Sequence, residues 1–114
     1  MPFGGTDIAA KTEQMTVKDS RFVSAAATLT RLQPNLHVAG GTGSFTITFE
    51  DPSKFGVGVG TIMLDSITSG TVTVAFPSGQ PANVSLTVAK DMVVGYSNGS
   101  EWFRLASIAG GTYA

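Results

Sequence analysis

The chain has 114 residues, enough for one domain with a hydrophobic core. Charged residues make up only 13% of it and the formal net charge is −1, which argues against binding to nucleic acid or to an anionic membrane surface. Cysteine is absent, which excludes disulfides, cysteine-ligated zinc and thiol catalysis. No stretch has the about 18 apolar residues of a membrane span, and no signal peptide is visible at the N-terminus.

Serine and threonine together account for 25 residues and glycine for 14. Hydroxyl groups therefore supply much of the solubility that lysine and glutamate usually provide. A surface of low charge does little to prevent self-association. The composition is typical either of a protein whose surface is covered by neighbouring subunits or of a monomer with a threonine-rich face.

Residues 1–20 have no clear helical or alternating pattern. Their apolar residues are scattered among glycine and polar residues and cannot form a core by themselves. We predict an extended N-terminal arm that packs on another subunit, rather than a free tail, with Phe3, Ile8 and Met15 at the protein interface. Residues 21–114 are then a single β-domain.

Residues 21–43 allow two interpretations. The alanines within 22–29 favour a short helix, whereas the alternation within 28–32 favours a strand. Pro34 ends either element, and 35–39 reads as another strand. The context of the chain favours strands throughout.

Residues 44–108 alternate apolar and hydroxyl residues, as in Phe45, Ile47 and Phe49 against Thr46 and Thr48. A period of two indicates strands with one buried face. Turn residues divide the stretch into six expected strands, over 44–50, 60–67, 71–76, 82–88, 91–97 and 100–108. The pattern predicts an all-β domain: an antiparallel sandwich, jelly roll or barrel.

The sharpest turn signal is Asn98-Gly99. This dipeptide supplies two residues of positive φ to a tight hairpin, so we expect 92–97 to pair antiparallel with 100–105.

The glycine-rich run 56–60 is not a phosphate-binding loop, because it lacks Gly-Lys-Ser/Thr and leads into an expected strand. We interpret it as a bend, a bulge or a close approach of backbones.

Catalytic and metal sites have little support. His37 is the only histidine and has no partner visible in the sequence, so we interpret it as a strand-face or interface residue. Asp19, Asp51 and Asp91 lie at turns, where aspartate caps its own backbone. Asp65 is expected mid-strand on a solvent or interface face. Glu50, Asp65 and Glu101 form no recognisable acid pair. We therefore predict no enzyme activity, no cofactor, no metal and no small-molecule ligand.

Three aromatic residues flank the expected hairpin: Tyr96, Trp102 and Phe103. Tyr96 and Trp102 could stack on a sugar, but Trp102 is expected to pack the hairpin onto the core.

The segment 84–105 resembles β-modules of tailed-bacteriophage virion proteins. It combines a threonine-rich strand, an apolar strand ending in Tyr96, the Asn98-Gly99 hairpin and the pair Trp102-Phe103. The resemblance extends over roughly 44–108. It implies a virion structural protein, typically a homotrimer, belonging either to the head-decoration (cement) proteins or to the tail fibres.

A fibre protein usually has a long shaft, for which this chain has no room, whereas it has a candidate arm. We therefore expect a decoration protein that bridges capsomers of the major capsid protein and is located in the virion. The alternative is a tail-fibre or tail-tip module that binds carbohydrate or a receptor.

Overall fold

The computed structural model describes residues 20–109 and the backbone of 112–113. The predicted arm, with Phe3, Ile8, Met15 and the turn residue Asp19, lies outside the described residues.

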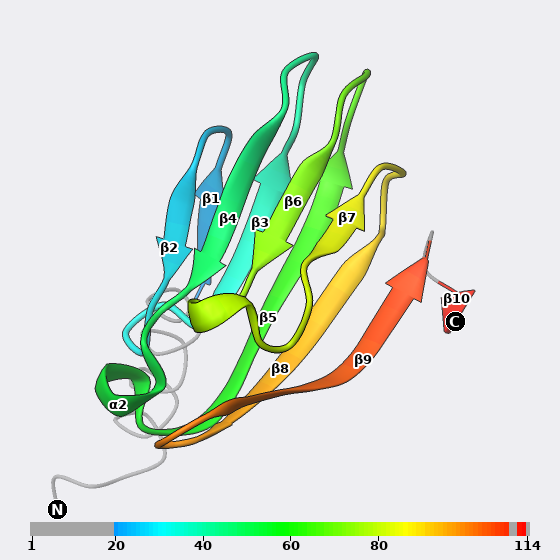
Figure 1. Cartoon of the computed structure of the whole chain (residues 1–114). Coiled ribbons are helices and arrows are strands. Elements are labelled where there is room, and N and C mark those ends of the chain that lie inside the picture. Colours follow the sequence, from blue (N-terminus) through cyan, green and yellow to red (C-terminus); the bar gives the residue numbers. More distant parts are fainter. Residues whose placement is uncertain (1–19, 110–111, 114) are drawn as a thin grey trace, which may run out of the picture.

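The described chain forms two stacked β-sheets, an all-β sandwich, as predicted (Figure 1). The six-stranded sheet has the order β1-β3-β5-β8-β9-β10 and the four-stranded sheet the order β2-β4-β6-β7. Neither sheet of the described residues closes into a barrel. The strands are β1 (Ser20–Val23), β2 (Ala27–Leu29), β3 (Asn35–Ala39), β4 (Phe45–Phe49), β5 (Val57–Ser66), β6 (Val72–Ala75), β7 (Val84–Leu86), β8 (Met92–Asn98), β9 (Trp102–Ala109) and β10 (Thr112–Tyr113).

The first six strands alternate between the two sheets, so the chain winds as a flattened coil. Each return to a sheet adds a parallel neighbour: β1, β3 and β5 in one sheet, and β2, β4 and β6 in the other. Parallel strands need a long crossover, and here the crossover includes a strand of the opposite sheet. Antiparallel pairing is confined to the last strands: β7, β9 and β10 each pair with the strand that precedes them in the chain, and β8 pairs with β5. The sheets are therefore mixed, because side-chain alternation specifies which face of a strand is buried but not the direction of its neighbour.

Residues 21–43 are strands, as the context indicated, and no helix forms over 22–29. At two places where the sequence indicated turns, the chain forms short helical turns. They are α2 (Pro52–Phe55) and the 3₁₀ turn η1 (Pro77–Gly79). The side chain of Asp51 accepts a hydrogen bond from the Ser53 N–H at 2.8 Å and so caps α2. Asp91 likewise accepts from the N–H groups of Thr87 and Val88 at 2.9 and 3.0 Å. Both aspartates therefore act on turn backbone as predicted.

The β8–β9 hairpin pairs antiparallel as predicted, with Tyr96 opposite Phe103 and Ser97 opposite Trp102. The geometry of its turn differs from the expectation, because only Gly99 has a positive φ, of 93°. The Asn98 side chain instead accepts from the N–H groups of Ser100 and Glu101, both at 2.8 Å. The Asn98 N–H in turn donates to the Glu101 carbonyl at 3.1 Å, so backbone and side-chain bonds together hold the turn over Gly99 and Ser100.

The core lies between the inner faces of the two sheets. Its buried members are Leu29, Leu36, Val38, Ile47, Phe49, Phe55, Ile62, Leu64, Val72, Val74, Phe76, Leu86, Val93 and Trp102. Phe49 is central: its ring stacks on Phe76 with centroids 4.5 Å apart and contacts Trp102 at the same distance. Opposite this ring, Gly60 and Gly95 are register partners on β5 and β8. A Cβ at Gly60 would lie 3.2 Å from the Phe49 ring, and one at Gly95 only 3.1 Å from it. Of the glycine-rich run, Gly60 makes a close approach, to side chains of the other sheet rather than to backbone, whereas Gly56 ends α2 before β5 begins.

Replacing Gly95 with alanine should destabilise the fold by about 1–3 kcal/mol, because the added methyl would overlap the rings of Phe49 and Phe76. Gly43→Ala is the matched control, since a Cβ there meets no atom within 4 Å. Urea unfolding followed by tryptophan fluorescence measures both variants. Equal stability of the two variants would show that the glycine pair does not hold the Phe49 ring.

Candidate functional site

The two outer faces of the sandwich differ in chemistry. On the four-stranded sheet, cross-strand partners Thr28 and Thr48, then Thr46 and Thr73, then Thr73 and Ser85 present hydroxyls outward. We call this surface the hydroxyl face. It is the threonine-rich face that was one of the two interpretations of the composition. It can hydrogen-bond to water throughout and needs no partner.

The six-stranded sheet is largely apolar on its outer face as well as its inner one, although Asn35 and Thr61, joined by a hydrogen bond of 2.6 Å, also lie on the outer face. We define the apolar face as the outward side chains of β1, β5, β8 and β9, alternating with the buried ones: Phe22, Val57, Val59, Met63, Met92, Val94, Tyr96, Phe103, Ala106 and Ile108. Phe22 is 77% exposed and Val57 72%. Leu105, in the bulge of β9, adds another exposed apolar side chain. Contiguous exposed apolar surface of this kind marks an interaction site.

Among the outward side chains of β1, β3, β5 and β8, one is a carboxylate and one is an imidazole, and these two pair with each other. The Asp65 carboxylate accepts from Nδ1 of His37, with Oδ1 at 3.1 Å and Oδ2 at 3.2 Å. The side chains are 29% and 30% exposed. Phe22 lies against the other side of the imidazole, with ring centroids 5.1 Å apart. Both residues therefore lie on a strand face as predicted, but His37 has a partner that the sequence did not reveal.

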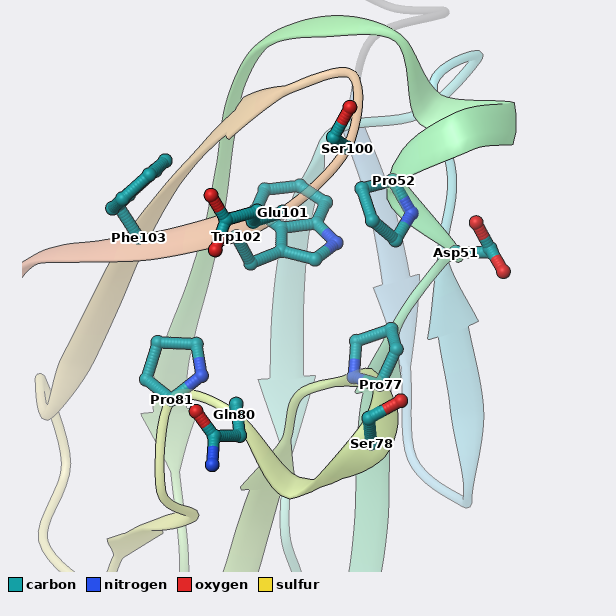
Figure 2. Close-up of a pocket in the computed structure, with 10 residues that line it drawn as sticks. All are labelled: Asp51, Pro52, Pro77, Ser78, Gln80, Pro81, Ser100, Glu101, Trp102 and Phe103. Carbon is teal, nitrogen blue, oxygen red and sulfur yellow. The ribbon is translucent and has the colours of Figure 1, made fainter.

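A second feature is a pocket of about 500 Å³ at the end of the sandwich where α2, η1 and the β8–β9 hairpin meet. Figure 2 shows the Trp102 indole between Pro52 on one side and Pro77 and Pro81 on the other. The remaining lining residues are polar except for Phe103: Asp51, Ser78, Gln80, Ser100, Glu101 and Phe103. Ser78 has a φ of 60°, a strained value for a residue other than glycine.

The acidic residues of the pocket do not form a catalytic pair. The Asp51 carboxylate points away from the indole in Figure 2 and accepts from the Ser53 hydroxyl at 2.7 Å. The Ser53 hydroxyl and N–H together lower the pKa of Asp51 below its usual value. Glu50 lies outside the pocket lining and accepts from the Arg31 N–H at 3.1 Å. Asp65 is on the apolar face, so the three acids considered from sequence are not brought together.

The aromatic residues of the hairpin separate onto two faces. Trp102 points into the core, is 5% exposed, and donates from Nε1 to the Glu50 carbonyl at 2.8 Å. Tyr96 lies on the opposite side and pairs with Phe103, with centroids 6.3 Å apart. A stacking platform of Tyr96 and Trp102 is therefore not formed, and the core role of Trp102 is confirmed.

Sequence reasoning missed the apolar face, although β5 and β8 carry its signal. Residues 57–64 and 92–94 are apolar or glycine at nearly every position, where a half-buried strand would alternate. Such runs are typical of strands covered on both faces.

Among residues 20–109, no group of three His, Asp or Glu side chains lies close enough to hold a metal ion. No helix within the described part of the chain is long and apolar enough to cross a membrane. Comparisons of this chain with protein families, curated proteins and solved structures gave no match.

Trp102→Ala should destabilise the domain by about 3–5 kcal/mol, because it removes the ring that joins Phe49, Phe55 and Phe76 and leaves the Glu50 carbonyl without its donor. Phe103→Ala is the control on the same strand, and a change near zero is expected because this ring is 43% exposed. Thermal unfolding by circular dichroism compares them. A Trp102→Ala protein as stable as wild type would contradict the core role.

Proposed function

We propose that this chain is a structural virion protein, a capsid decoration protein that works as a homotrimer, with its copies in contact through the apolar face. The observation that carries the self-association is the contrast between the apolar face and the hydroxyl face. The virion assignment rests on the resemblance of residues 84–105 to phage β-modules.

We expect the apolar face to be buried against another protein surface. Burial of apolar surface contributes about 25 cal/mol per Å², and stable interfaces bury about 1,200–2,000 Å² in total. Outward side chains of β1, β5, β8 and β9 contribute to such an area, with Phe22 and Val57 almost fully exposed in the isolated chain.

The cover that suits this face best is a second copy of the same chain. Apart from the His37–Asp65 pair, the outward side chains of β1, β3, β5 and β8 carry no charged group. Identical copies therefore meet without repulsion between like charges, and no charge pattern is present that would select a different, charged partner. Sheet faces pack against each other readily, so three copies can enclose their apolar faces around a common axis.

The sheet edges are poor alternatives to the face. The edge strands β1, β2, β7 and β10 are only two to four residues long. Arg21 on β1 is the register partner of the buried Leu36 and therefore points inward; its guanidinium donates to the Thr28 carbonyl on β2 at 3.5 Å. Short edges and inward charges discourage addition of another strand.

In the decoration role, the trimer would bind across adjoining capsomers of the major capsid protein and add buried contact area that resists internal pressure. The hydroxyl face would remain toward solvent. The arm of residues 1–20, with Phe3, Ile8 and Met15, stays a prediction for the contact with the capsid. The mechanism needs no cofactor and no catalytic residue.

Val59→Lys should convert the trimer into monomers, with association weakened about 100-fold or more, because a lysine on the apolar face would be buried without a partner. Thr46→Lys places the same charge on the hydroxyl face and should leave the mass unchanged. Light scattering after size exclusion, over a range of concentrations, measures the mass. A monomeric wild type at all concentrations would refute self-association through this face.

The decoration role itself is tested on heads that lack this protein. Wild type should co-sediment with them and raise their resistance to heat, whereas a chain lacking residues 1–19 should keep its β circular dichroism and lose binding. If the wild type does not bind to these heads, the decoration role is refuted. The proposal of a trimer would still stand, as a module of another part of the virion.

The second candidate function is a tail-fibre or tail-tip module that binds carbohydrate, and the pocket around Trp102 favours it. The proline rings of the pocket, together with Gln80 and Glu101 in its lining, suit a neutral saccharide, because the carboxylates of Asp51 and Glu101 repel an anionic one. In this case Gln80→Ala and Glu101→Gln should each weaken binding in a neutral-glycan array, while Thr46→Ala should not. A wild type that binds no glycan would eliminate this alternative.

A further inference from the structure

The His37–Asp65 pair brings ionisable side chains to a surface that is largely apolar over β5 and β8. The neighbouring polar pair, in which the Thr61 hydroxyl donates to Asn35 Oδ1 at 2.6 Å, is satisfied within the chain. The His37–Asp65 pair lies between Phe22 on β1 and Met63, the register partner of His37 on β5. The two residues are 28 positions apart, and the parallel pairing of β3 with β5 brings them together. A purely apolar interface would not contain a hydrogen-bonded pair of this kind.

The backbone of β5 is shaped around this pair. The register runs from Val38 opposite Leu64 to Ala39 opposite Ser66, so Asp65 is the extra residue of a bulge. A bulge redirects a side chain relative to the regular strand. Here it accompanies a carboxylate with both oxygens within 3.2 Å of Nδ1 of the imidazole.

Resting on the proposed self-association, we infer that the His37–Asp65 pair determines the register and the number of copies in the assembly. In the isolated chain, about a third of the surface of each of these two side chains is exposed to water. Once copies cover the apolar face, that water is removed, and the pair can stay only where its remaining polar atoms find partners on a neighbouring copy. Apolar side chains tolerate sliding of one sheet over another, whereas a buried polar pair permits few arrangements.

The polar atoms needed for this are present. No described residue of the same chain forms a hydrogen bond with Nε2 of His37. This nitrogen is therefore free to bond a carboxylate or carbonyl of the adjacent copy. A single polar residue in an apolar seam fixes register and copy number in coiled coils by the same physics.

The test compares His37→Leu with the double variant His37→Leu/Asp65→Leu. The single variant leaves the Asp65 carboxylate without its partner, and association should weaken about 100-fold. The double variant removes both polar groups, so association should return to wild-type strength or exceed it. Its native mass spectrum should then show several oligomers where wild type shows one.

The matched control is Thr46→Leu/Thr73→Leu, which replaces two polar side chains on neighbouring parallel strands of the hydroxyl face. It should give one oligomer with the wild-type association constant. Urea unfolding of each variant, fitted at concentrations below its association, verifies that the domain itself is intact.

Failure of this inference is distinguishable from failure of the proposed function. If wild type forms one oligomer and both leucine variants form that same oligomer with an unchanged association constant, the pair has no role in assembly and the inference is overturned. If wild type does not associate while Val59→Lys changes nothing, self-association through the apolar face is itself refuted.

Discussion

The packing of the Phe49 ring against the Gly60–Gly95 pair is the constraint on which the rest of the sandwich depends. Only glycine at both positions lets a strand of one sheet approach the other closely enough for this ring. The ring in turn supports Phe76 and Trp102, which close the end of the core beside α2. Because side chains alternate along β5 and β8, Ile62, Leu64 and Val93 point into the core with the glycines, and the apolar side chains between them point outward. The core and the apolar face are thus two consequences of one strand pair.

The two outer faces of the sandwich differ in how they interact with water. Threonines on the four-stranded sheet provide hydrogen-bonding groups without charge, in a chain with only 13% charged residues. The six-stranded sheet concentrates the apolar surface on one flat side instead of distributing it. Short edges and the inward Arg21 discourage growth along the sheets.

The sequence was sufficient for the features that depend on local pattern. Alternation in Phe45–Phe49 specified the buried side of β4, and Asn98-Gly99 located the hairpin. Parallel pairing could not be predicted, because the partner of β3 is a strand more than 20 residues away and alternation says nothing of direction. The His37–Asp65 pair depends on that pairing and on a bulge, so neither residue alone indicated it. The pocket likewise requires three separate segments to meet at Trp102.

The coil of β1 to β6 explains why binding features lie at particular places in this fold. Successive turns of the coil stack parallel strands, so residues far apart in sequence become side-by-side neighbours on a flat surface. A sheet face suits another broad surface. The hollow described at the hairpin end lies where the coil gives way to antiparallel strands and the chain must turn through α2 and η1. In this architecture a broad protein contact belongs on the stacked strands, and a small ligand belongs at the end.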